Sequence, residues 1–150
     1  NGREWLYKNV TPRVVAEAFI GSADGTLPDD YKFFCFDGVA RAICVCTNRS
    51  EKHADYFFFD RDFQRLPVNE ATANLPEDFV FPKPARYEEM LRVAEALSNG
   101  IKHVRVDLYD TEQGVRFGEL TFFDQSGFAD DYVGDGDRIM GEFLKLEEQA

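Results

Sequence analysis

Residues 103–123 read HVRVDLYDTEQGVRFGELTFF, and this stretch decides the fold. The pattern predicts two strands, residues 103–109 and 115–123, joined by a glycine-containing turn at residues 110–114. Apolar and polar residues alternate along both strands, so each has one apolar face and one face that can carry chemistry. Directly opposed residues on antiparallel strands lie on the same face. A register that matches apolar with apolar residues therefore puts Asp107 beside Glu119.

Asp107 and Glu119 would repel each other unless a positive group lay between them. A divalent cation is one such group, and Mg²⁺ takes oxygen ligands from one or two carboxylates, water and substrate phosphates. Thr121 adds a hydroxyl on the same face, and Arg105 could contact a phosphate oxygen. The alternative stays open that both carboxylates are solvated on an exposed sheet face, with Arg105 in a surface ion pair.

The rest of the chain predicts an α+β fold around an antiparallel sheet. Residues 13–20 form a β-branched, apolar run typical of a strand, and residues 31–36 and 39–46 flank Asp37-Gly38, a strong hairpin signal. Residues 56–59 fit a further strand, residues 67–84 a long loop, and residues 138–146 a last helix. The clearest helix spans residues 86–98 and stops at Asn99-Gly100. Its predicted buried stripe is Tyr87, Met90, Leu91, Ala94 and Leu97.

The composition indicates one globular domain over residues 1–150. The chain has 44% hydrophobic residues, 15% aromatic residues and a formal charge of −11. The charge argues against nucleic acid as a partner, because phosphate-backbone affinity needs clustered Lys and Arg. No apolar run is long enough for a membrane span. Three cysteines without a C-x-x-C motif favour buried thiols and a reducing, cytoplasmic location.

Other catalytic and metal motifs are excluded. The chain has no G-x-S-x-G sequence and no Walker-type phosphate loop, which argues against common hydrolase and P-loop sites. The Asp-rich residues 130–137 lack the ligand order of an EF-hand. His53 and His103 are not spaced as metal ligands.

The stretch VRVDLYDTEQGVRFGELTFFDQSGF, residues 104–128, resembles the metal-binding end of the ATP-grasp superfamily, where an R-x-D strand precedes an E-x-N strand. More narrowly it resembles the TupA-like branch, found in gene clusters for capsular and cell-surface polysaccharides. Four further segments agree with that branch, so the resemblance covers nearly the whole chain. They are DDYKFFCFDG (residues 29–38), residues 60–63, FPKPARYEEMLRVAEAL (residues 81–97) and DRIMGEFLKL (residues 137–146).

The resemblance implies a role for each matching position. The adenine hinge would be Glu17, Ala18, Phe19 and Ile20, and the ribose-binding carboxylate Asp30, with Asp29 as a near rival. Lys32 and Arg105 would contact phosphate and serve as the catalytic residues. Asp107 and Glu119 would bind Mg²⁺. Thr121 would be a third metal ligand, at a position where many ATP-grasp enzymes have Asn.

By the same resemblance the chain is the C-terminal portion, or lobe, of an ATP-grasp fold, without the upstream lobe that carries a glycine-rich loop. The implied activity is an ATP- and Mg²⁺-dependent ligase that activates a carboxylate as an acyl phosphate in cell-surface polysaccharide biosynthesis. Its partners would be a nucleotide and a polysaccharide or amino-acid precursor. Alternatives are a non-catalytic scaffold or partner-binding module, and a glycosyltransferase-associated protein. Exposed Phe residues favour self-association. Asp107→Asn is expected to abolish metal-dependent nucleotide binding and leave the fold intact.

Overall fold

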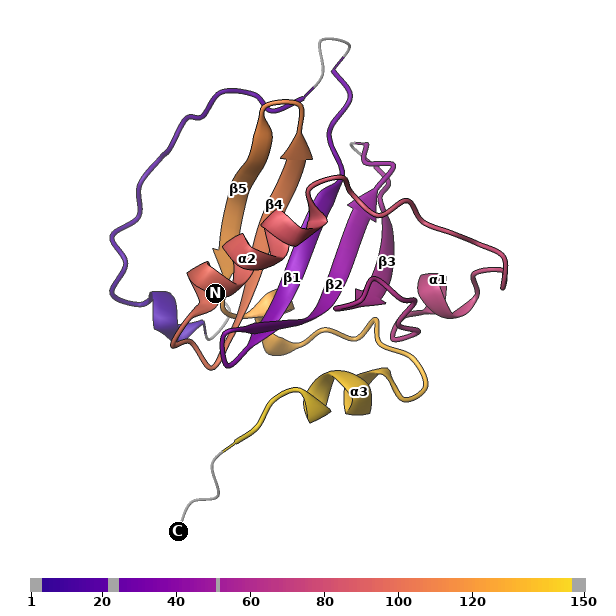
Figure 1. The fold of residues 1–150 in the computed structure, drawn as a ribbon. Helices are drawn as coiled ribbons and strands as arrows, with labels where there is room; N and C mark the ends of the chain where they lie inside the picture. Colours follow the sequence, from indigo (N-terminus) through magenta and orange to yellow (C-terminus); the bar gives the residue numbers. More distant parts are fainter. Residues whose placement is uncertain (1–3, 22–24, 51, 147–150) are drawn as a thin grey trace.

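The computed structural model describes residues 4–21, 25–50 and 52–146. Its centre is a five-stranded antiparallel sheet in the order β3-β2-β1-β4-β5 (Figure 1). The strands are β1 (Asp30–Phe36), β2 (Val39–Thr47), β3 (Asp55–Asp60), β4 (His103–Thr111) and β5 (Gly114–Thr121). The helical segments are η1 (Trp5–Tyr7), α1 (Glu70–Ala73), α2 (Tyr87–Ser98), η2 (Asp124–Gly127) and α3 (Gly136–Glu142). The predicted α+β class is confirmed.

The β1–β2 hairpin forms where the sequence predicts it. Asp37 and Gly38 have φ angles of 50° and 76°, the left-handed conformation that a tight two-residue hairpin turn requires at both positions. Phe36 pairs directly with Val39 across this turn. The hairpin supplies β1, the central strand of the sheet, and its neighbour β2.

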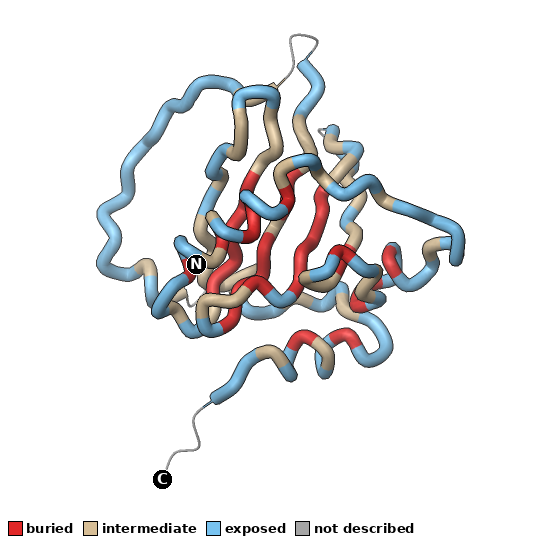
Figure 2. The backbone as a smooth tube through the Cα atoms, viewed as in Figure 1, coloured by how far each residue is buried: buried red, intermediate tan, exposed pale blue. Residues whose placement is uncertain are grey.

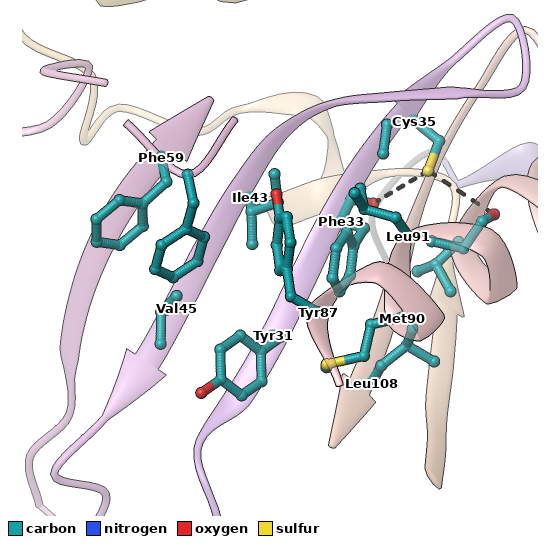
Figure 3. Packing of buried hydrophobic residues seen from close by; sticks show 14 of the residues in the cluster. Tyr31, Phe33, Cys35, Ile43, Val45, Phe59, Tyr87, Met90, Leu91 and Leu108 are labelled. Atoms are coloured by element: carbon teal, nitrogen blue, oxygen red, sulfur yellow. Dashed lines mark hydrogen bonds between the residues drawn. The ribbon is translucent and has the colours of Figure 1, made fainter. Parts of the chain in front are cut away.

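Helix α2 covers one face of the sheet and closes the main core. Its side chains Tyr87, Met90 and Leu91 point toward β1, β2 and β4, where they meet residues such as Phe33 and Leu108 (Figure 3). All five of these residues are at most 5% exposed. This apolar burial stabilises the helix, since helices in proteins are held mainly by the packing of one face.

The predicted stripe on α2 is wrong at one position. Leu97 is 40% exposed, whereas Ser98 is fully buried. At 100° per residue, Leu97 lies about 80° from Tyr87 around the helix and Ser98 only about 20° from it. Ser98 therefore continues the buried face, and the helix stops at Asn99, before Gly100 with its φ of 75°.

The opposite face of the sheet is divided into an apolar and a polar part. The apolar part contains Phe34, Phe36, Cys44 and Phe58, which pack with Met140 of α3. The polar part lies beside it, over β1, β4 and β5, and is described below.

Helix α3 ends at Glu142, earlier than the predicted end near residue 146, because Gly141 weakens its last turn. All three cysteines are free and buried, in agreement with the sequence analysis.

Helix α1 covers the outer edge of β3. The backbone N–H of Phe58 donates to Thr72 Oγ1 at 2.8 Å, and Asn69 Nδ2 donates to the carbonyl oxygen of Tyr56 at 3.0 Å. Asn69 Oδ1 also accepts a hydrogen bond from the N–H of Thr72 and so caps the helix. These side chains take up backbone groups that an edge strand would otherwise present to solvent.

The predicted strand at residues 13–20 is wrong. This segment has no regular structure and forms an arc outside β5 (Figure 1). Val14, Val15 and Phe19 are 102%, 74% and 68% exposed, and the tube is pale blue along this part of the arc (Figure 2). A strand needs a partner for its backbone hydrogen bonds, and no described strand pairs with this segment.

No helix in the described part of the chain is long and apolar enough to cross a membrane.

Candidate functional site

The polar part of the sheet is assembled by the pairing of β1 with β4. Lys32 lies directly opposite Asp107, and Asp30 opposite Tyr109. Because opposed residues share a face, these side chains project from the sheet on the side away from α2. The two strands are separated by 65 residues or more in the sequence, so neither segment alone predicts the contact between Lys32 and Asp107.

A bulge between β4 and β5 brings Glu119 to the same place. Val106 pairs with Leu120 and Leu108 with Phe117, so Asp107 alone faces both Gly118 and Glu119. The extra residue lets two apolar residues of β5, three positions apart, both oppose apolar residues of β4. A Cβ on Gly118 would lie 3.0 Å from the carbonyl oxygen of Asp107, so glycine permits this close approach.

Arg105 is the centre of the polar cluster. Its Nε donates to Asp107 Oδ1 at 2.7 Å, and its Nη2 donates to Asp107 Oδ2 at 2.9 Å, a bidentate grip. Nη2 also donates to Glu119 Oε1 at 2.7 Å and to Thr121 Oγ1 at 3.1 Å. Nη1 donates to Asp124 Oδ1. The positive group predicted between Asp107 and Glu119 is therefore, in this structure, a guanidinium.

Lys32 extends the cluster to a further carboxylate. Its Nζ donates to Asp107 Oδ2 at 2.6 Å and to Asp30 Oδ2 at 2.7 Å. Asp30 Oδ1 is buried and has no hydrogen-bond partner among the described residues. A buried acceptor without a partner is costly, and in a native structure it calls for an unseen donor.

Burial differs strongly between the two expected metal carboxylates. Asp107 is only 2% exposed, so the alternative of a solvated position is wrong for this residue. The Glu119 side chain is 60% exposed, and solvent reaches one side of the cluster there. The site thus has a closed end at Asp107 and an open end at Glu119.

The pKa values follow from burial and from these ion pairs. Burial raises the pKa of the Asp30 carboxyl, although Lys32 acts in the opposite direction. Burial alone would lower the pKa of Lys32, but the charges of Asp107 and Asp30 hold it above its ordinary value. The same balance raises the pKa of Arg105, mainly through Asp107. Both cations therefore stay charged at neutral pH.

A cavity of about 340 Å³ opens over the part of this cluster that contains Asp30, Lys32, Asp107 and Glu119, within the size range of small-molecule sites. It is lined by Glu17, Ile20, Asp30, Lys32, Arg49, Asp107, Tyr109, Phe117, Gly118 and Glu119. Of the four residues expected to form the adenine hinge, Glu17 and Ile20 line the cavity. Ala18 and Phe19 do not line it and are exposed.

Two residues of the site escaped the sequence analysis. Arg49, in the β2–β3 loop, lines the cavity; burial alone would lower its pKa, but a hydrogen bond to Tyr109 and the charge of Asp30 raise it. Asp124, at the start of η2, contacts Arg105. Both residues lie outside the strands, so the alternation of apolar and polar residues along a strand does not indicate them.

The described residues contain no group of three or more His, Cys, Asp or Glu side chains arranged to hold a metal ion. Both oxygens of Asp107 are engaged by Lys32 or Arg105. The assignment of Asp107, Glu119 and Thr121 as metal ligands therefore remains a proposal.

Comparisons with known proteins give the following similarities. The sequence model of a family described as TupA-like ATPgrasp matches residues 1–145. A structure of the ATP-grasp ligase PsnB complexed with minimal precursor is 13% identical, with a TM-score of 0.36, and the match covers 79% of this chain and 35% of that chain. A second PsnB structure, with a phosphomimetic variant of minimal precursor, Mg and ADP, is 12% identical, with a TM-score of 0.37 and coverage of 79% and 34%. The chain thus spans about a third of the length of these structures. No curated protein matches significantly.

Proposed function

Because the chain belongs to the TupA-like ATP-grasp family, we propose that its polar cluster binds ATP and Mg²⁺ as part of an ATP-dependent ligase. In this proposal the chain is the C-terminal portion of an ATP-grasp fold and supplies the metal-binding hairpin and part of the adenine hinge. The reaction is activation of a carboxylate as an acyl phosphate. The resemblance to the TupA-like branch supports a cell-surface polysaccharide or amino-acid precursor as the substrate, handled in the cytoplasm.

One observation carries the proposal. Six residues that the resemblance assigns to nucleotide and metal form one connected network of hydrogen bonds and ion pairs. They come from three different strands and meet beside the cavity that Glu17 and Ile20 also line. A purely structural sheet face would not require these residue types to converge. The six are Asp30, Lys32, Arg105, Asp107, Glu119 and Thr121.

The residues present fit both ligands chemically. Lys32 and Arg105 meet four carboxylates, those of Asp30, Asp107, Glu119 and Asp124, so these six side chains carry a formal charge of −2. Arg49 beside Asp30 reduces this charge to −1. The remaining negative charge and the carboxylate oxygens suit a divalent cation, since Mg²⁺ prefers oxygen ligands. The unpartnered Asp30 Oδ1 fits a hydroxyl donor such as that of a ribose.

Each charged residue of the cluster has its own role in this proposal. Asp107 and Glu119 would hold Mg²⁺, which neutralises charge on the transferred phosphate. Lys32 carries a fixed positive charge at the cavity wall for phosphate oxygens. Arg105 orients both carboxylates. It also keeps one N–H of Nη1 without a partner among the described residues, since Nη1 carries two and contacts only Asp124.

A non-catalytic scaffold is the second candidate. It is favoured by the engagement of both Asp107 oxygens by Lys32 and Arg105. In that case the ion pairs are the final state of the cluster, and the chain binds a protein partner instead of a nucleotide. Exposed apolar residues such as Val14, Phe117 and Phe128 support such contacts, including self-association.

Calorimetric titration of the chain with a non-hydrolysable ATP analogue, with and without Mg²⁺, tests the proposal. The informative variant is Glu119→Gln, since this side chain is exposed and its loss should leave the core unchanged. Its matched control is Glu112→Gln, which removes the same charge at the far turn of the same hairpin. Mg²⁺-dependent binding should weaken at least about tenfold in Glu119→Gln and stay unchanged in Glu112→Gln. Absence of binding in the wild type would favour the scaffold.

A further inference from the structure

Arg49 and Tyr109 meet beside Asp30 in the wall of the cavity. Asp30, the first residue of β1, lies opposite Cys46 of β2 on one side and opposite Tyr109 of β4 on the other. Arg49 is the second residue after β2 and donates a hydrogen bond to the Tyr109 hydroxyl. Because β1 lies between β2 and β4, the Arg49 side chain crosses the start of β1 to reach it. Both side chains line the cavity and are half-buried.

The two cations that line the cavity differ in their partners. Lys32 is engaged by the carboxylates of both Asp107 and Asp30. Arg49 forms no ion pair with a described carboxylate, and Glu119 pairs with Arg105, which does not line the cavity. Arg49 is therefore the cation of the described cavity wall that is still available to a ligand.

Neutralisation of Asp30 does not account for the position of Arg49. Lys32 already pairs with Asp30 Oδ2, and the atom that needs a donor is Oδ1. Oδ1 has no partner among the described residues, although the charge of Asp30 acts on Arg49. The guanidinium donates to the Tyr109 hydroxyl instead. Tyr109 thus holds Arg49 at the cavity without using its charge.

The remaining donors of Arg49 suit an oxyanion. A guanidinium has five N–H groups in a rigid planar fork, which matches two oxygens of a carboxylate or a phosphate. The other charged groups of the wall are Lys32 and four carboxylates, those of Glu17, Asp30, Asp107 and Glu119. Carboxylates repel an anion, so an anionic ligand in this cavity needs a cation that is not already paired.

We propose that Arg49 is the anion-binding residue of the cavity and binds the phosphate or carboxylate oxygens of the ligand, in the orientation that Tyr109 holds. Under the proposed function the two sources of such oxygens are the nucleotide phosphates and the carboxylate that is activated. The source of the anion therefore rests on the proposed function. The anion site itself rests on the cavity wall.

Three variants of the full chain test this proposal. Arg49→Gln removes the charge and the fork, whereas Arg49→Lys keeps the charge alone. Arg116→Gln is the matched control, because Arg116 pairs with Tyr109 from β5 but does not line the cavity. Each protein is titrated, in the presence of Mg²⁺, with a non-hydrolysable ATP analogue, with adenosine as its uncharged counterpart, and with succinate as a simple carboxylate. The Tm of each variant reports whether the fold is retained.

If the anion is phosphate, Arg49→Gln should bind the ATP analogue about tenfold more weakly or worse, the factor for a lost charge-assisted hydrogen bond. Adenosine affinity should then stay unchanged. If the anion is the substrate carboxylate, the loss should appear with succinate and not with the ATP analogue. In either case Arg49→Lys should recover part of the loss, and Arg116→Gln should match the wild type at equal Tm.

Unchanged affinity of Arg49→Gln for both anions would overturn the proposal. An equal loss for adenosine and the ATP analogue would overturn it too, since Arg49 would then shape the cavity instead of binding charge. The same holds for an equal loss in Arg116→Gln, and for a wild type that binds neither anion. Succinate binding that depends on Arg49, in a chain that binds no nucleotide, would refute the proposed function and leave the anion site standing.

Discussion

Asp107→Asn should destabilise the chain substantially, contrary to the sequence-based expectation that the fold stays intact. The carboxylate is the shared partner of Lys32 and Arg105, at side-chain exposures of 3%, 17% and 10%. Removal of one partner of a buried ion pair costs about 3–5 kcal/mol, because the remaining charge is left buried. Here each cation keeps another carboxylate, Lys32 that of Asp30 and Arg105 those of Glu119 and Asp124. The expected loss is therefore smaller, about 2–3 kcal/mol.

For a chain of this size about 1 kcal/mol corresponds to roughly 2–4 °C in Tm. Asp107→Asn should thus lower Tm by about 4–12 °C, measured by circular dichroism, and lower the urea midpoint at an unchanged slope. Glu119→Gln is the comparison, since its exposed side chain should cost less than about 1 kcal/mol. Equal losses in the two variants would refute the reasoning that Asp107 is the buried counterion of both cations.

Three further changes test the fold and its pH dependence. Gly136→Ala should cost about 1–3 kcal/mol, because its Cβ would lie 2.4 Å from the backbone oxygen of Val68; an unchanged Tm would contradict the tight docking of α3. Thr72→Val should cost about 1–3 kcal/mol in urea unfolding, because it leaves the buried N–H of Phe58 without its acceptor; a neutral effect would mean that this edge of β3 is solvated. Burial holds the pKa of His103 below its ordinary 6.5, so the unfolded chain binds the proton first as pH falls. Stability relative to His103→Gln should then decrease below pH 6.5, by up to about 1.4 kcal/mol per unit, and parallel pH curves would exclude this linkage.

The sequence predicts those parts of the fold that local periodicity determines. The hairpin around Asp37-Gly38 and the buried face of α2 follow from turn chemistry and from apolar spacing. The strand expected at residues 13–20 has the right residue types but pairs with no described strand, and pairing is not a local property. Leu97 was misplaced because it lies at the margin of the helical stripe.

The sequence predicts only part of the polar cluster. Alternation along the strands correctly indicates that Asp107 and Glu119 are neighbours. A regular alternation predicts neither the bulge at Gly118 nor the position of the Arg105 guanidinium between the two carboxylates. Asp124 lies in a turn, where no periodic pattern indicates its contact with Arg105.

A crystal structure of the chain with an ATP analogue and Mn²⁺ in place of Mg²⁺ tests the central claim most directly. The account predicts phosphate density against Lys32 and an anomalous Mn²⁺ peak within ligand distance of Asp107 and Glu119. For that, Asp107 must give up part of its present contact with Lys32 or Arg105. A nucleotide bound elsewhere would contradict the account. An unchanged ion-pair cluster at saturating ligand would contradict it as well.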